Sequence, residues 1–259
     1  PFFYILGRVT STLIGIAIAT VTNIFVVRPR HELTFRQELK QLTKNFPELY
    51  INAVEAFSSS NTELVSRVLQ DLKKAEDEIA SLNIELNYLK AGSESRYGIY
   101  LEGIDLQELV YYEQGVHFLE NVLVKIHDIV EVTEKRWLHK TRARLQDERK
   151  KRSAEFENLL EAVRELAQKL AQLHKSVFLL VGGKKQSLLP DINRQTDEIK
   201  YLKEEVREKL RHWQVEHIQE LDIFSLMSTH RVIFDLEEIT NGLRKFANAC
   251  ANLTGEEER

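Results

Sequence analysis

The feature that most constrains this chain is an uncharged stretch of 19 residues, Val9–Val27, with Arg8 before it and Arg28-Pro29-Arg30-His31 after it. As a helix rising about 1.5 Å per residue, it covers roughly the 30 Å hydrocarbon core of a bilayer. It is too long for the apolar part of a typical signal peptide, and no small-x-small cleavage site precedes the basic cluster. We therefore expect residues 1–28 to hold one transmembrane helix, which Pro29 ends.

The basic cluster also predicts the orientation of this helix. Cytoplasmic flanks of membrane helices carry an excess of Lys and Arg, and Arg28 and Arg30 follow the apolar stretch directly. We expect residues after about 30 to lie in the cytoplasm. Because the chain begins at Pro1 without an initiator Met, we also expect it to be a fragment of a longer membrane protein.

One edge of the predicted span carries small or polar side chains at i, i+4 spacing. These are Ser11, Gly15, Ala19 and Asn23. Such an edge lets other membrane helices approach closely, and it favours packing in a multi-helix bundle over a lone anchor, although small residues are common in membrane helices generally. Arg8 either snorkels to the outer surface, which is the favoured interpretation, or contributes to a substrate-binding anion site.

The remaining residues, 29–259, are typical of long helices. With only 10 Gly and 4 Pro in 259 residues, the chain lacks the frequent turns of a β-rich fold. Apolar residues alternate spacings of three and four, most regularly at Val65, Val68, Leu72, Ala75, Ile79, Leu82, Leu86 and Leu89. A stripe of this kind requires a partner helix. We therefore predict an all-α fold in which residues 29–259 form a cytoplasmic antiparallel bundle of long, coiled-coil-like helices.

Helix ends follow from breakers and from the phase of the stripes. Pro47 should kink its helix or begin a new one, and residues 58–61 should form a loop. Gly182-Gly183 should end a helix, and Pro190-Asp191 should begin the next. The last residues, from Gly255, should be frayed.

The apolar stripe changes face between the runs 116–137 and 156–180. One uninterrupted helix cannot keep both runs against the same partner. The chain must therefore turn, or change partners, within the segment that joins the two runs.

That joining segment, residues 135–152, is strongly basic. Nine basic residues stand against Asp147 and Glu148, a net charge of +7 over 18 residues. The nine are Lys135, Arg136, Lys140, Arg142, Arg144, Arg149, Lys150, Lys151 and Arg152. A solvated helix face is the commonest origin of such charge, and contact with anionic lipid or a protein comes second, at about 1 kcal/mol per basic group near a membrane. Nucleic-acid binding is disfavoured because no groove-reading motif accompanies the charge.

No constellation typical of catalysis or metal binding stands out. The single Cys, Cys250, excludes an internal disulfide and lies in a core register. Glu113 with His117, and Glu208 with His212, share helix faces, but two ligands are too few, so surface ion pairing is the better interpretation. We expect no enzyme, no cofactor and no metal site.

The residues Arg8–Ile16, followed by Asn23-Ile24-Phe25 and Pro29, resemble the last membrane helix of the bacterial aromatic acid exporter family, among the fusaric acid resistance protein-like membrane transporters. Arg96-Tyr97 and Leu109–Tyr112 are also similar to the middle of that family's tail. The resemblance implies a cell-membrane protein with six membrane helices, of which this chain holds the last. It further implies efflux of aromatic carboxylates, energised by an ion gradient.

On this resemblance, residues 1–28 are the last transmembrane helix of a truncated membrane domain, and residues 29–259 are a C-terminal helical domain for oligomerisation or regulation. The expected partners are membrane lipid, the missing upstream helices and further copies of the chain. The alternative is a membrane-anchored coiled-coil scaffold or sensor with a single span and no transport activity. Reading the coding sequence upstream of Pro1 separates these two predictions.

Overall fold

The computed structural model describes residues 2–22, 28–59, 61–94, 106–144, 154–183, 188–216 and 223–256. Within these ranges the chain is helical and forms no β-strand. The helices are α1 (Phe2–Thr22), α2 (Arg28–Ser59), α3 (Thr62–Glu94), α4 (Leu106–Arg144), α5 (Ala154–Gly183), α6 (Leu189–Glu216) and α7 (Ile223–Glu256). The prediction of an all-α fold is confirmed.

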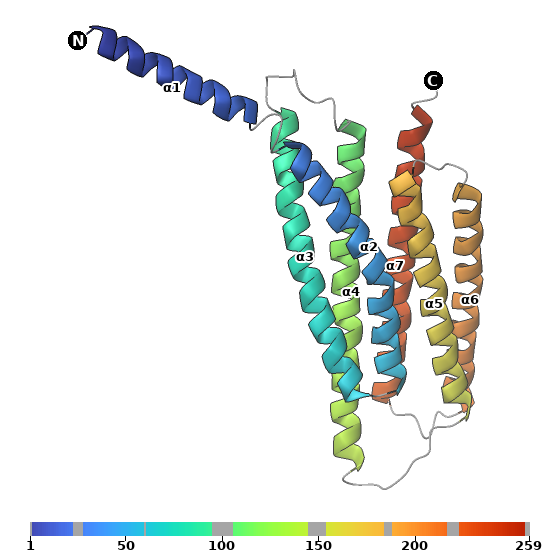
Figure 1. The fold of residues 1–259 in the computed structure, drawn as a ribbon. Helices are drawn as coiled ribbons and strands as arrows, with labels where there is room; N and C mark the ends of the chain where they lie inside the picture. The colour runs from blue at the N-terminus through green and yellow to red at the C-terminus, as the bar shows by residue number, and fades with distance from the viewer. Residues whose placement is uncertain are drawn as a thin grey trace.

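Helices α2 to α7 form an up-and-down bundle from which α1 projects (Figure 1). Helices α2, α4, α5 and α7 surround the centre, α3 packs over α2 and α4, and α6 packs over α5 and α7. The chain therefore folds into two consecutive three-helix units, α2–α4 and α5–α7. They join along two antiparallel helix pairs, α2 with α5 and α4 with α7.

The predicted heptad stripes form the core of this bundle. In α3, the stripe residues from Val65 to Leu86 are buried, and Leu89 is partly buried. The side chains between them are mostly exposed. Burying a Leu, Ile or Val side chain stabilises a fold by about 1.5–3 kcal/mol, so each stripe holds its helix on the bundle.

Helix α2 bears on the two boundaries that proline predicts, at Pro29 and at Pro47. It begins at Arg28, so Pro29 lies in its first turn, where proline is tolerated. It also continues through Pro47, which excludes the second of the two predicted outcomes, a new helix beginning there, and leaves the first, a kink, as a prediction. Pro47 is buried between Phe46 and Leu49, which are buried too. The packing of these neighbours offsets the backbone hydrogen bond that Pro47 cannot donate.

The predicted loop at residues 58–61 is shorter than expected. Ser58 and Ser59 belong to α2, where their hydroxyls donate hydrogen bonds to Val54 O (2.8 Å) and Glu55 O (2.7 Å). Asn61 then caps α3, because its Oδ1 accepts from the backbone N–H groups of Glu63 (3.0 Å) and Leu64 (3.3 Å).

The change of face between the second and third stripes is explained by two separate helices. Helix α4 ends at Arg144 and α5 begins at Ala154. They belong to different three-helix units, and α4 packs mainly on α3 and α7 whereas α5 packs mainly on α2 and α6. Gly183 ends α5, as predicted, and Pro190 lies in the first turn of α6. Helix α7 continues to Glu256, past the expected start of the frayed tail.

Candidate functional site

Helix α1 is apolar but unburied. Its large apolar side chains are more than half exposed: Val9 52%, Leu13 61%, Ile14 55%, Ile16 59%, Ile18 61% and Val21 55%. A helix with apolar residues all round is typical of one that is surrounded by an apolar medium or by other helices. The bundle does not provide these surroundings, because α1 projects away from it (Figure 1).

No helix within the described residues combines the length and the apolar character that crossing a bilayer requires. The transmembrane helix predicted over residues 9–27 is therefore not confirmed. Residues 23–27 of that stretch lie outside the described part of the chain.

The predicted packing edge of α1 is exposed. Ser11, Gly15 and Ala19 lie on the surface, and a Cβ atom added to Gly15 would meet no other atom within 4 Å. Ser11 Oγ donates to Arg8 O (3.0 Å), so its hydroxyl is satisfied inside the helix. Asn23 lies outside the described residues. Packing of this edge against other helices stays a prediction, as does a substrate role for Arg8, whose side chain is exposed.

The basic segment is described only in part. Lys135 is exposed and pairs with Glu131 on the preceding turn of α4, at 2.5 Å between Nζ and Oε1. Lys140, Arg142 and Arg144 belong to α4, but their side chains are not described, and residues 149–152 lie outside the described ranges.

Arg136 is the exception in this segment, because its side chain is only 2% exposed. Its guanidinium lies over the rings of Phe57 (4.5 Å) and Phe156 (5.2 Å), and Nη1 donates to Phe57 O (3.3 Å). The prediction that Arg136 contacts lipid or another anionic surface is wrong, because the charge is enclosed between α2, α4 and α5. Cation–π contact stabilises a guanidinium there, by about 2 kcal/mol or more when it is desolvated.

A second buried polar group, His174 on α5, lies where the four central helices meet. Its ring is fully buried and stacks on Phe178, with 4.8 Å between centroids and an angle of 16°. Phe118 (5.9 Å) and Tyr50 (6.0 Å) complete part of the aromatic surroundings. Burial, with a smaller effect of the Lys175 charge, lowers the pKa of His174 to about 3. The imidazole is therefore neutral at pH 7.

Neither ring nitrogen of His174 has a hydrogen-bond partner within the described part of the protein, and the same holds for the hydroxyl of Tyr50. Burial raises the pKa of Tyr50. Unsatisfied buried polar groups cost about 1–3 kcal/mol each. The sequence analysis did not predict His174 or Tyr50 as buried polar groups. The available signal was that His174 follows a stripe residue, Leu173, and lies four residues after Leu170.

A charged cluster joins α4 to α7. Arg231 on α7 binds Asp128 on α4 through Nη2 and Oδ2 (2.5 Å) and Asp235 on its own helix through Nε and Oδ2 (3.1 Å). Lys125 Nζ lies 3.7 Å from the other oxygen of Asp235. Burial raises the pKa of Asp235 to about 6, against the lowering effect of Arg231. The cluster fixes the register of the two helices across the unit interface.

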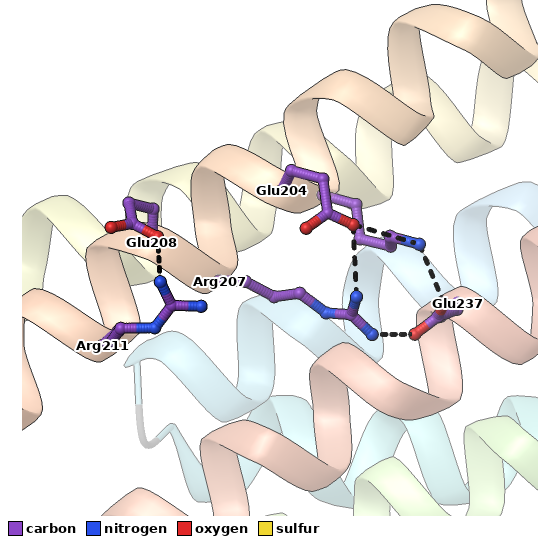
Figure 2. A network of polar contacts seen from close by, with 6 residues as sticks. Glu204, Arg207, Glu208, Arg211 and Glu237 are labelled. Carbon is purple, nitrogen blue, oxygen red and sulfur yellow. Dashed lines mark hydrogen bonds and ion pairs between the residues drawn. The ribbon is translucent and has the colours of Figure 1, made fainter.

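A more exposed network links α6 to α7, as Figure 2 shows. Glu237 accepts hydrogen bonds from Lys203 Nζ (2.8 Å) and Arg207 Nη2 (2.6 Å), and Arg207 also binds Glu204 (3.2 Å). Ion pairs at a surface contribute about 0–1 kcal/mol each, so this network assists the packing of α6 without replacing it.

The two Glu/His pairs singled out in the sequence take part in surface ion pairs with other partners. Glu208 binds Arg211 (2.8 Å) and His212 faces Glu216 (3.2 Å). In the same way, Glu113 binds Lys90 (2.7 Å) and His117 faces Glu120 (3.6 Å). In the part of the chain that the structure describes, no group of three or more His, Cys, Asp or Glu residues could hold a metal ion.

Comparison with known proteins adds no assignment. No protein-family model matches the chain, and no curated protein matches it. The resemblance of residues 8–29 to the aromatic acid exporters therefore stays a prediction.

Proposed function

We propose that α1, together with the uncharged residues that follow it in the sequence, inserts into a membrane, and that α2–α7 form a helical domain attached to it. The observation that carries this proposal is the exposure of the apolar side chains of α1, from Val9 to Val21. Transfer of six such side chains out of water favours insertion by roughly 10 kcal/mol, at about 1.5–3 kcal/mol for each full burial.

Two features of α1 support a place among other membrane helices. Between Val9 and Val21 the helix carries no charge, so lipid contact leaves no ion in the hydrocarbon. The hydroxyls of Ser11, Thr12 and Thr20 donate to carbonyls of the same helix, which satisfies them without water. The small edge at Ser11, Gly15 and Ala19 then suits close approach of a neighbouring helix.

In this proposal the protein is the C-terminal part of a bacterial membrane transporter resembling the aromatic acid exporters. The basic residues Arg28 and Arg30 support a cytoplasmic location for the bundle, because cytoplasmic flanks of membrane helices carry an excess of Lys and Arg. The bundle serves oligomerisation or regulation of the membrane domain, and efflux of aromatic carboxylates uses an ion gradient. Arg8, near the other end of the apolar stretch, is the candidate contact for a substrate carboxylate.

The alternative is a membrane-anchored scaffold or sensor without transport. The continuous apolar core that α2–α7 build for themselves favours it, because such a bundle needs no membrane domain to fold. An efflux assay separates the two functions. Cells expressing the full gene should lose labelled hydroxybenzoate faster than cells without it if the protein is a transporter, and at the same rate if it is a scaffold.

Membrane insertion itself is tested by flotation of the chain with phosphatidylcholine liposomes at high salt. We expect the chain to float and to resist alkaline extraction, and we expect the Ile14→Lys/Ile18→Lys variant to remain in the aqueous fraction. The matched control is Leu179→Lys/Val215→Lys, which places the same charges at equally exposed apolar positions of the bundle (64% and 70%) and should still float. A wild-type chain that never floats would falsify the proposal.

A further inference from the structure

An open groove lies between α3 and α4 on the outside of the bundle, with a volume of about 560 Å³. Glu76, Glu120 and Asp128 contribute carboxylates to its lining, and no Lys or Arg lines it. His127 and Asn83 are the other polar side chains in the lining. The groove is therefore an acidic surface that a positively charged partner would complement.

The same groove presents apolar surface. Ile79 and Leu123 belong to the core and form part of its lining, and Val124 beside them is 59% exposed. Two further apolar side chains of α3 lie along the same exposed side in steps of four residues from Ala80. They are Ile84 (56% exposed) and Tyr88 (59% exposed). Apolar side chains within an acidic rim are the complement of a basic amphipathic helix.

The acidic rim is only partly neutralised within the chain. Asp128 binds Arg231, and Glu120 accepts a hydrogen bond from Asn83 (2.7 Å). Glu76 forms no ion pair with the described residues, and it stands on the α3 side of the groove. The electrostatic attraction for a cationic partner therefore acts chiefly from Glu76, with Glu120 opposite.

The chain itself carries a segment of the required chemistry, residues 137–152, which follows the buried Arg136. It holds seven basic residues against Asp147 and Glu148, a net charge of +5. Its start is an exposed part of α4, where Leu138 is 53% exposed next to basic residues. A copy cannot place this segment in its own groove. At about 1.5 Å per residue, Arg144 lies roughly 30 Å along α4 from Val124. The nine residues that follow must also reach Ala154, which lies at the same end of the bundle (Figure 1).

We propose that the α3/α4 groove binds the basic segment, residues 137–152, of a second copy of the chain. Helix α4 contributes one wall of the groove and, as far as Arg144, the first part of the segment. Two copies can therefore bind each other through both contacts at once when their α4 helices run antiparallel about a twofold axis. The contact then closes on itself as a dimer. This inference rests on the proposed function only in taking the bundle as the oligomerising domain, and it does not depend on whether α1 enters a membrane.

The dimer is tested by disulfide cross-linking between two differently tagged full-length chains in detergent, each carrying Cys250→Ser. One chain carries Val124→Cys in the groove and the other carries Arg142→Cys in the segment. We expect mixed covalent dimers on mild oxidation, at least about tenfold more than when Arg142→Cys is paired with Tyr201→Cys on α6. Equal yields from the two pairs would overturn the proposal, because Tyr201 is exposed on the far side of the bundle (77%).

Charge reversal tests the recognition itself. Glu76→Lys in the groove chain should lower the yield several-fold, whereas Asp77→Lys, the same change at the next residue of α3 and outside the groove lining, should not. Adding Arg149→Glu/Lys150→Glu to the segment chain should restore the yield with Glu76→Lys. If Glu76→Lys and Asp77→Lys act alike, the groove is not the binding surface and the inference is wrong. The liposome experiment gives an independent answer, so loss of flotation and loss of cross-linking are distinguishable.

Discussion

Helices α1 and α3 contain similar numbers of apolar residues and arrange them in opposite ways. The apolar residues of α3 are confined to one stripe, from Val65 to Leu86, and the bundle buries that stripe. The apolar residues of α1 lie on every side of the helix, and the bundle buries none of those described between Val9 and Val21. The comparison teaches that the direction of apolar side chains, more than their number, decides whether a helix is stabilised by its own chain or by its surroundings.

The largest expected difference between the two helices is in the loss of stability when a leucine is truncated to alanine. Leu82 of α3 is fully buried, and Leu82→Ala should lower the free energy of unfolding by about 3 kcal/mol, because it removes buried surface and leaves a cavity. Leu13→Ala in α1 should change it by less than about 0.5 kcal/mol. Chemical denaturation followed by circular dichroism measures both. Similar losses for the two variants would mean that α1 packs on the bundle.

Acid should act on the bundle through His174. The pKa of His174 is lowered to about 3 by burial, whereas an unfolded chain binds a proton near pH 6.5. The bundle therefore has its full stability above pH 6.5, and this contribution is lost progressively as the pH falls toward 3. At pH 4.5 the loss is about 3 kcal/mol.

The matched variant for this acid effect is His174→Phe, which keeps an aromatic ring among Phe118 and Phe178 but cannot be protonated. Between pH 7 and pH 4.5 the unfolding free energy of the wild type should therefore fall by about 3 kcal/mol more than that of His174→Phe. Parallel pH profiles for the two proteins would show that His174 is accessible to protons in the folded bundle. No described side chain of α1 between Val9 and Val21 titrates, so flotation should not follow this profile.

Arg136 gives a smaller effect at the contact between the two units. Arg136→Lys should destabilise the bundle by about 2 kcal/mol, because an ammonium cannot reproduce the planar contact with Phe57 and Phe156. Lys135→Arg, the neighbouring exchange at an exposed position, should be close to neutral. Thermal melts of the two variants provide the measurement. If Arg136→Lys left the melting temperature unchanged, the Arg136 guanidinium would be in contact with water and not enclosed by the two rings.

The smallest effect is expected at the exposed α6–α7 network. Arg207→Ala removes two ion pairs, to Glu204 and Glu237, and should lower the unfolding free energy by less than about 1 kcal/mol. The difference from wild type should shrink further in 1 M salt, where charges on the surface are screened. A loss that is large or insensitive to salt would make the network part of the folding core.

Much of the bundle was readable in the sequence because its signals are local. The 3-4 spacing of α3, the glycine pair that ends α5 and the change of face before residue 156 each predicted what the structure contains. Of the two outcomes predicted at Pro47, a kink or a new helix, the structure excludes the new helix. A breaker acts through one lost hydrogen bond, whereas the packing of Phe46, Leu49 and Tyr50 acts through several buried side chains.

The candidate sites were less predictable. Arg136 counted as one of nine basic residues in a solvated segment, yet it is buried by rings from α2 and α5. The groove on α3 and α4 combines Glu76 with Glu120, which are 44 residues apart and share no local pattern. Pairings of this kind depend on which helices become neighbours, and a heptad stripe specifies that a partner is needed without specifying which one.

The sequence by itself determined that the chain is helical, where some of its helices begin and end, and that one stretch is uncharged over 19 residues. These properties depend on residues within one or two turns of each other. The tertiary structure alone decided the order of helices around the bundle, the burial of Arg136 and His174, and the acidic groove. These depend on side chains from different helices meeting in space, and the free energy of such contacts is set by burial, which no local window of sequence contains.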